Sequence, residues 1–309
     1  MKLFDLHCDT ATECEKQGVS LVSNSLDWDF LRASKLFSSS VQATAVYIPD
    51  DMNEEDAWSY ALRVFSFIDG QSVPIFKCDE DFYEKPHGIV LAVENGKAIG
   101  DDLSRIAVLA SMGVKYITVT WNGSNRLGHG ALSGKTEGLT VFGKAAVAEM
   151  LRYGIYPDVS HLNEAGFWDV AKLSQGLPML ASHSDSMAVH AHPRNLTDDQ
   201  FRAVRDSGGL VGLNLCKEHL GCHSFEQFER HFVKYLELDG ENTVALGMDL
   251  DGTPVPKTWH GVEVAVRLYD RLLSKGYAQA LVDALFYENS LAFFTKSLTS
   301  REKCIRIGT

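Results

Sequence analysis

Short apolar runs recur along the chain and alternate with stretches whose apolar residues follow a helical period. Several of the runs are nearly continuous in Val, Ile, Leu and Ala, which is typical of parallel strands covered on both faces. The predicted strands are Leu3–Leu6, Val41–Ile48, Gly88–Val93, Lys115–Thr120, Ile155–Val159, Met179–Ser182, Leu210–Asn214 and Val244–Met248.

The stretches between these strands predict amphipathic helices, and one of them has clear start and stop signals. Thr197 and Gln200 form a capping box at its start, and Gly208-Gly209 ends it. The predicted helices are Asp56–Ile68, Phe142–Tyr153, Glu164–Leu173, Thr197–Ser207 and Phe225–Leu236.

This alternation predicts an α/β protein with a TIM-like (β/α)8 barrel, although an open doubly wound sheet shares the pattern. The connection over residues 10–40 and the segment after Asp249 are long enough for extra helices. We find no repeat, low-complexity tract or Pro- or Gly-rich linker, and therefore expect one domain over residues 1–309.

Composition narrows the class of protein. The 309 residues are 45% hydrophobic and 23% charged, as in ordinary globular enzymes. A net charge of −12 argues against a nucleic-acid or anionic-membrane partner. Since the sequence shows no signal peptide and no membrane-spanning run, we expect a cytoplasmic protein whose six cysteines, Cys304 included, are reduced thiols.

Imidazoles and carboxylates follow the predicted strands. His7 and Asp9 end the first strand, and Glu94 ends the third. His161, His183 and Asp249 follow the fifth, sixth and eighth strands. Because the carboxyl ends of barrel strands meet on one face, where catalytic groups gather, we expect these side chains to converge.

These residue types suit a divalent metal centre at that face. His7 and Asp9 lie two residues apart on an extended segment, so both side chains point the same way. His161 and His183 add two nitrogens, and Glu94 can bind one ion with each carboxylate oxygen. Each residue alone could be structural; the joint pattern at strand ends favours two zinc-like ions that activate water for hydrolysis.

The motifs around these residues resemble those of the membrane (renal) dipeptidase family, a group of metal-dependent amidohydrolases. The resemblance runs from the first strand to Tyr287-Glu288-Asn289 and keeps the family's order. Its motifs are His7-Cys8-Asp9, Val93-Glu94-Asn95-Gly96, Asp158-Val159-Ser160-His161, Ser182-His183-Ser184, His192-Pro193-Arg194-Asn195 and Gly247-Met248-Asp249-Leu250-Asp251-Gly252.

The resemblance implies a zinc-dependent dipeptidase that cleaves the amide bond of dipeptides through a metal-bridging hydroxide. In that arrangement His7 and Asp9 hold one zinc ion, and His161 and His183 hold the other. Glu94 bridges the two ions and belongs to the catalytic centre. Family members are often homodimers, so a homodimer is expected here as well.

The resemblance also implies substrate and proton-transfer residues. Arg194 matches the arginine that grips the substrate carboxylate, a task suited to a planar bidentate donor. Asp249 matches the catalytic carboxylate that passes a proton from the metal-bound water to the leaving amine. If Asp249 does not have this role, Asp251 and Asp185 are the next candidates.

Two positions depart from the family pattern. Trp121 stands where family dipeptidases commonly have a histidine after the fourth strand, and indole offers one neutral donor. Asn122 beside it, or His129 on the following loop, could take over part of that role, so Trp121 and Asn122 are candidate substrate-binding residues. Trp121 could alternatively pack under its loop as core. Cys216 stands where the mammalian enzymes have a pocket tyrosine.

Two other functions compete with a dipeptidase. The same metals could serve another amidohydrolase that acts on N-acyl (D-)amino acids or cyclic amides. A non-catalytic barrel could also serve as a binding or scaffold protein, but the intact metal shell together with Asp249 argues against it. Arg194 favours the dipeptidase, because a free α-carboxylate needs a cationic partner.

Overall fold

The computed structural model describes residues 1–295 and shows a closed barrel of eight parallel strands in chain order. The barrel closes where Asp5 of the first strand pairs with Leu246 of the last, which confirms the predicted barrel over the open sheet. Cys304 lies outside the described residues. The strands are β1 (Leu3–Cys8), β2 (Ser40–Tyr47), β3 (His87–Glu94), β4 (Val114–Thr118), β5 (Tyr156–Asp158), β6 (Leu180–Ala181), β7 (Leu210–Leu213) and β8 (Val244–Leu246).

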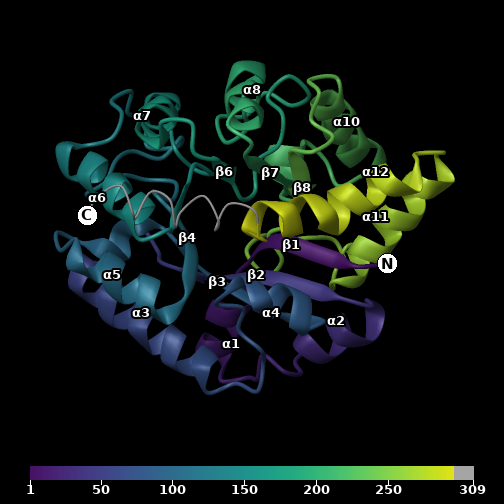
Figure 1. The fold of residues 1–309 in the computed structure, drawn as a ribbon, viewed down its shortest axis with the longest axis horizontal. Helices are drawn as coiled ribbons and strands as arrows, with labels where there is room; N and C mark the ends of the chain where they lie inside the picture. Colours follow the sequence, from purple (N-terminus) through teal and green to yellow (C-terminus); the bar gives the residue numbers. More distant parts are fainter. Residues whose placement is uncertain (296–309) are drawn as a thin grey trace.

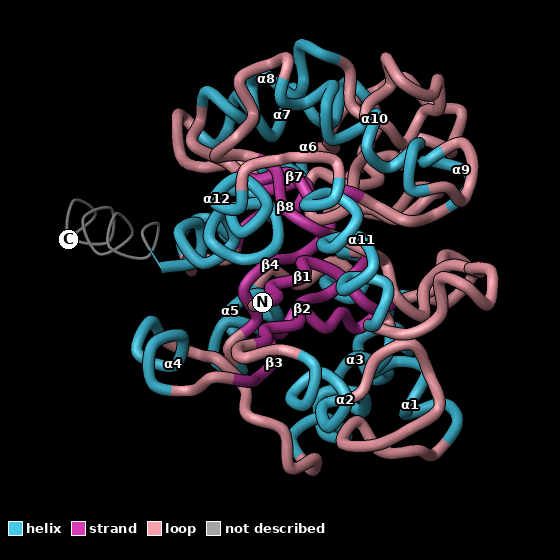
Figure 2. The backbone as a smooth tube through the Cα atoms, turned by 90° about the vertical axis from the view of Figure 1, so that its right-hand side faces the viewer, coloured by secondary structure: helices cyan, strands magenta, loops and turns pink. Residues whose placement is uncertain are grey.

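Helices surround the strands, which lie at the centre of the molecule in the ribbon of Figure 1 and in the backbone tube of Figure 2. The long first connection contains α1 and α2, and the segment after β8 contains α11 and α12, as expected. The helices are α1 (Thr10–Gln17), α2 (Phe30–Leu36), α3 (Glu54–Asp69), α4 (Asp79–Glu84), α5 (Ser104–Met112), α6 (Val141–Arg152), α7 (Glu164–Ser174), α8 (Asp198–Asp206), α9 (Lys217–Leu220), α10 (Phe225–Leu236), α11 (Glu263–Ser274) and α12 (Gln279–Asp283), with short turns η1 (Gly96–Ile99) and η2 (Ala284–Glu288).

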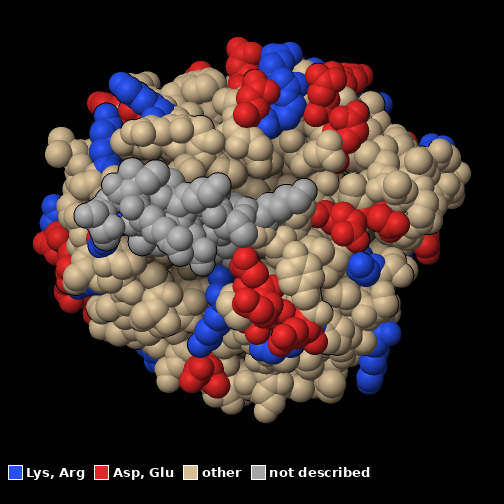
Figure 3. Space-filling view, viewed as in Figure 1, with Lys and Arg blue, Asp and Glu red and all other residues tan. Residues whose placement is uncertain are grey.

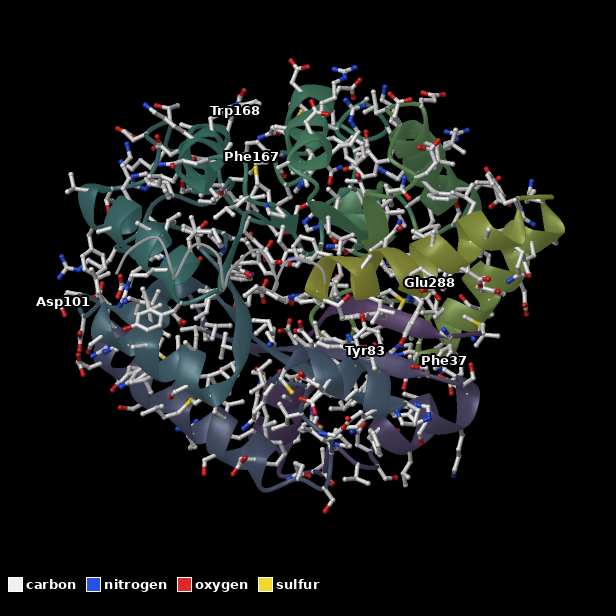
Figure 4. All side chains as sticks on the ribbon, viewed as in Figure 1. Phe37, Tyr83, Asp101, Phe167, Trp168 and Glu288 are labelled. Atoms are coloured by element: carbon white, nitrogen blue, oxygen red, sulfur yellow. The ribbon has the colours of Figure 1, made fainter. Side chains whose placement is uncertain are left out.

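Local signals in the sequence explain these helices. The predicted capping box of α8 is present: Thr197 Oγ1 accepts a hydrogen bond from Gln200 N at 3.2 Å, and Gln200 Oε1 accepts one from Thr197 N at 2.9 Å. On α7, Phe167 is buried against the barrel while its neighbour Trp168 is 40% exposed (Figure 4). The helix therefore turns an apolar side chain to the core and leaves the next one at the surface.

The barrel interior is apolar at the amino ends of the strands. Phe4 at the start of β1 packs against Phe82 and Phe294, with ring centroids 5.9 and 5.3 Å apart. A second and larger apolar cluster fills the space between strands and helices. Aromatic packing thus fills the amino end, and the residues of the predicted site lie at the carboxyl end.

Several strands end earlier than predicted, because the chain leaves the ladder to present polar groups. The prediction extended the eighth strand to Met248, but Met248 N donates to the side chain of Asp5 at 2.8 Å instead of to a backbone carbonyl of a neighbouring strand. Asn95, His161 and Asp249 follow strand ends with φ of 84°, 71° and 62°. At these positions the backbone leaves the extended conformation of the strand.

A bulge in β1 directs His7. Asp5 pairs with Gln42 and Cys8 with Thr44, so Leu6 and His7 together oppose one residue of β2. A strict two-residue alternation would place His7 on the outer face with Asp5. The extra residue shifts the phase, so His7 follows Leu6 into the barrel mouth.

The surface carries both charge signs and shows no membrane-spanning helix. Lys and Arg side chains lie among Asp and Glu side chains over the face drawn in Figure 3. Among the described residues, every helix is too short or too polar to cross a bilayer.

Candidate metal centre

The side chains predicted to converge at the carboxyl ends of the strands do converge. His7 Nε2 lies 3.6 Å from Glu94 Oε2, 3.9 Å from Asp9 Oδ1 and 3.8 Å from Asp249 Oδ1. All of these residues are buried. One half of the site therefore places an imidazole nitrogen among three carboxylates.

The other half of the site is formed by two histidines that lie near Oε1, the second carboxylate oxygen of Glu94. His161 Nε2 lies 2.9 Å from Glu94 Oε1, and His183 Nε2 lies 3.5 Å from it. The two Nε2 atoms are 2.8 Å apart. Glu94 thus turns one oxygen to His7 and the other to His161 and His183, as a carboxylate shared by two ions requires.

The donors fit divalent cations. His7 Nε2 and Asp9 Oδ1 are buried and have no hydrogen-bond partner among the described residues. Such atoms are costly to bury unless something binds them. The donors of His7, Glu94 and His183 lie within 4.8 Å of one another, as do those of His7, Asp9 and Asp249. Imidazole with carboxylate is a ligand set that suits zinc.

Electrostatics supports the same assignment. Burial alone would lower the pKa of His7, but the nearby carboxylates, Glu94 first, raise it to about 10. Burial raises the pKa of Asp249 to about 7, against the opposing effect of His7. Burial and Glu94 together raise the pKa of Asp9 well above its usual range. The site concentrates negative charge that a cation would neutralise.

Each predicted histidine ligand is supported from behind at its Nδ1 atom. His7 Nδ1 lies 3.4 Å from Tyr116 Oη, and His183 Nδ1 lies 2.7 Å from Ser182 Oγ. His161 Nδ1 lies 3.0 Å from Asn122 Oδ1. These contacts orient the rings and leave Nε2 facing the site. Asn122, which the sequence analysis named as a candidate substrate-binding residue, thus contacts His161 on the side of the ring away from Glu94.

Arg194 is a buried cation with an unused donor. It is 3% exposed, and its Nη2 donates to the His183 carbonyl at 3.4 Å. Its Nε has no hydrogen-bond partner among the described residues. Burial lowers its pKa, whereas Glu94 and Asp249 raise it. Arg194 therefore faces the site with donors available to an anionic group.

Trp121 lies at the mouth of the site. Its ring meets Tyr47 edge to face at 5.0 Å and lies 6.2 Å from His161. Both Trp121 and Tyr47 are partly exposed, so the tryptophan is not a fully buried core residue. His129 Nδ1 instead lies 2.8 Å from Ser124 Oγ on the same loop.

Cys216 and Asp251 have local partners. Cys216 is buried, and its Sγ lies 3.2 Å from Glu218 Oε2. Asp251 accepts hydrogen bonds from Thr10 Oγ1 at 2.5 Å and from Asp27 N at 2.7 Å. Its carboxylate thus holds the loop before α2.

Residues that the sequence analysis did not assign complete the site. A Cβ on Gly252 would lie 2.2 Å from Asp9 Oδ2 and 2.3 Å from Asp249 Oδ1, so a larger residue would have to displace these carboxylates. Tyr116 and Ser182 stand behind two of the histidines. Gly252 and Ser182 lie within the recognised motifs, but their roles depend on contacts between distant strands.

Comparisons with known proteins agree with this geometry. The sequence model of the membrane dipeptidase family, peptidase family M19, matches residues 1–304. A protein of Klebsiella pneumoniae described as an uncharacterized protein in the pqqA 5′ region is 34% identical over 230 residues, which are 70% of this chain and 83% of that protein.

Solved structures show the same fold. A metallo peptidase from Rhodobacter sphaeroides, liganded with a phosphinate mimic of the dipeptide L-Ala-D-Ala, superposes with a TM-score of 0.87 at 26% identity and covers 96% of this chain and 99% of its own. A structure described as dipeptidase AC, a metallo peptidase of family M19, has the same TM-score, identity and coverage.

Proposed function

Because the chain belongs to the membrane dipeptidase family, peptidase family M19, and is thus a metallo-dipeptidase, we propose that it hydrolyses dipeptides with two zinc ions. The observation that carries this proposal is the placement of Glu94, whose oxygens face His7 on one side and His161 and His183 on the other.

The proposed ligands divide into two sets around Glu94. His7 and Asp9 would hold one ion, and His161 and His183 the other, with Glu94 shared. Two such ions, when bound, lower the pKa of water and polarise the amide carbonyl. The buried Nε2 of His7 and Oδ1 of Asp9, which have no other partner among the described residues, support this division.

Arg194 would bind the free carboxylate of the dipeptide. A buried guanidinium with a partnerless Nε can offer a charge-assisted pair of hydrogen bonds. This contact would orient the scissile amide over Glu94 and exclude substrates without a carboxyl end. Trp121 would form an apolar wall of the pocket, and Asn122 would fix His161 beside it.

Asp249 would move the proton. Its Oδ1 lies 3.8 Å from His7 Nε2, and burial raises its pKa to about 7, near the working pH of most enzymes. The carboxylate would accept a proton from the attacking water at Oδ1 and donate it to the leaving amine. Asp251 is held by other groups and would not compete for this role.

A substrate panel tests the proposal. The Rhodobacter sphaeroides neighbour was crystallised with a mimic of L-Ala-D-Ala, so L-Ala-D-Ala and L-Ala-L-Ala are the first dipeptides to compare. N-acetyl-D-Ala and a cyclic dipeptide represent the alternative amidohydrolase reactions. We expect faster hydrolysis of the free dipeptides than of either alternative compound, and the cyclic dipeptide also lacks the carboxylate that Arg194 would bind. Faster turnover of the N-acyl or cyclic compounds would replace the proposal with the alternative.

The cellular setting is also proposed from the sequence. A cytoplasmic homodimer that does not bind nucleic acid stays our prediction, and the net charge of −12 supports the last point. Size-exclusion chromatography with light scattering measures the oligomeric state directly.

A further inference from the structure

A carboxylate that is not among the proposed metal ligands lies behind one of the histidines. Asp158 ends β5 and is completely buried. Its Oδ2 accepts hydrogen bonds from Ser182 Oγ at 2.6 Å and Thr118 Oγ1 at 2.7 Å. Its Oδ1 accepts from the backbone N–H groups of Ser182 at 2.8 Å and Ser160 at 3.1 Å. Four hydrogen bonds therefore hold the Asp158 carboxylate in place.

The same serine hydroxyl reaches His183. Ser182 Oγ lies 2.7 Å from His183 Nδ1. A hydroxyl has one proton, and Ser182 donates it to Asp158. The oxygen lone pair then accepts the Nδ1 proton of His183, which leaves the lone pair of His183 on Nε2, 3.5 Å from Glu94 Oε1.

The charges around the two proposed metal positions differ. Asp9 and Asp249 both lie within 4.0 Å of His7, on one side of Glu94. The other side offers two neutral imidazoles and a single oxygen of Glu94. The Arg194 guanidinium also approaches this side, with its Nη2 3.4 Å from the His183 carbonyl. The positive charge of an ion at the His161–His183 position is thus less well neutralised by the ligands that bind it.

We propose that Asp158 and Ser182 are positioning residues that transmit negative charge to His183, fix its tautomer and set the affinity of the His161–His183 position for its ion. This proposal rests on the proposed two-metal function. Asp158 would offset the nearby Arg194 charge without occupying a coordination position. Outer partners of this kind typically change metal affinity by about 10- to 100-fold when removed.

Zinc binding to the chelator-stripped protein tests this proposal without any substrate. Zinc affinity is measured by competition with a chromophoric chelator, and the absorption spectrum of the cobalt(II)-loaded protein reports ligand geometry. We expect Ser182→Ala to weaken one of two zinc equivalents by about 10- to 100-fold, to leave the other unchanged and to alter the cobalt spectrum. Asp158→Asn should act in the same direction.

Thr118→Val is the matched control. It deletes a hydrogen bond to the same Asp158 oxygen, at 2.7 Å and equally buried, from a residue that makes no hydrogen bond to His183. We expect its zinc affinity and cobalt spectrum to match the unmodified protein, even if its melting temperature falls. Because Ser182→Ala removes a single oxygen, it keeps the test valid if Asp158→Asn does not fold.

The outcomes separate the two proposals. If the unmodified protein binds two zinc ions and Ser182→Ala binds both with unchanged affinity, Asp158 has no role at the metal centre. Equal losses of zinc affinity in Ser182→Ala and Thr118→Val would show a merely structural carboxylate and overturn the inference. If the unmodified protein binds no stoichiometric zinc, the two-metal function itself fails, and this inference fails with it.

Discussion

Replacing Arg194 with lysine should weaken the hydrolysis of dipeptides that carry a free carboxylate. Arg194 is 3% exposed and keeps a donor, Nε, without a partner among the described residues. A planar guanidinium can offer two parallel hydrogen bonds to a carboxylate, whereas an ammonium is a point charge on a flexible stem. The variant would keep the positive charge and lose the two-donor geometry.

The expected magnitude follows from the contact that is lost. A hydrogen bond to a charged group contributes about 1.5–3 kcal/mol. Loss of one such bond corresponds to roughly a 10- to 150-fold decrease in kcat/KM, because each 1.4 kcal/mol is tenfold. We expect the change mainly in KM, since Arg194 binds the end of the substrate that does not react.

The assay compares a dipeptide with its C-terminal amide, in Arg194→Lys and in a matched control. Arg105→Lys is suitable, because Arg105 is also buried and its Nη2 pairs with Glu55 at 2.5 Å, away from the metal centre. Only Arg194→Lys should reduce the preference for the free dipeptide over the amide. Equal losses on both substrates would refute the role of Arg194 as the carboxylate site.

Four further predictions follow from the site. Asp249→Asn should lower kcat by about 10²- to 10⁴-fold with metal content intact; loss of metal together with activity would make Asp249 a ligand instead of a proton carrier. Trp121→His should change relative kcat/KM among dipeptides, and loss of the edge-to-face contact with Tyr47 should itself cost about 0.5–1.5 kcal/mol of stability; an unchanged substrate ranking would remove Trp121 from the pocket. Gly252→Ala should reduce bound metal, because the new Cβ would collide with Asp9 and Asp249; full metal content by elemental analysis would disprove the collision. Burial raises the pKa of Asp185 to about 8 in the native state, so its carboxyl stays protonated at pH values where the unfolded chain has lost the proton. The free energy of unfolding therefore falls as the pH rises from about 4 to 8. Asp185→Asn should therefore stabilise the metal-free protein at pH 8 relative to pH 5 in urea unfolding; the same effect at both pH values would contradict this pKa.

The fold was predictable because its signal is repeated along the chain. Apolar runs and amphipathic stretches alternate from β1 to α10, and each strand–helix pair independently indicates a β/α fold. The strand ends were less predictable, because they depend on partners far away in sequence. Met248 leaves the ladder to donate to Asp5, and the β1 bulge at Leu6 and His7 exists only through pairing with β2.

The candidate metal ligands were predictable for a related reason. Imidazoles and carboxylates directly after strands must converge once a barrel forms, whatever the details of packing. The groups behind them were not predictable in the same way. Asp158 reaches His183 only because β5 and β6 are neighbours and Ser182 lies between them. The hydrophobic periodicity cannot reveal this chain of hydrogen bonds from Asp158 through Ser182 to His183, because each of the three residues alone looks like an ordinary buried polar residue.

The most direct test of the central claim is a zinc titration of the metal-free protein, with bound metal and L-Ala-D-Ala hydrolysis followed in the same samples. We predict that bound zinc rises to about two ions per chain, since the donor set completes two sites. Activity should be absent without metal and should require the second equivalent, and Glu94→Gln should lose both ions together. Hydrolysis by metal-free protein, or a chain that binds no stoichiometric zinc, would contradict the account.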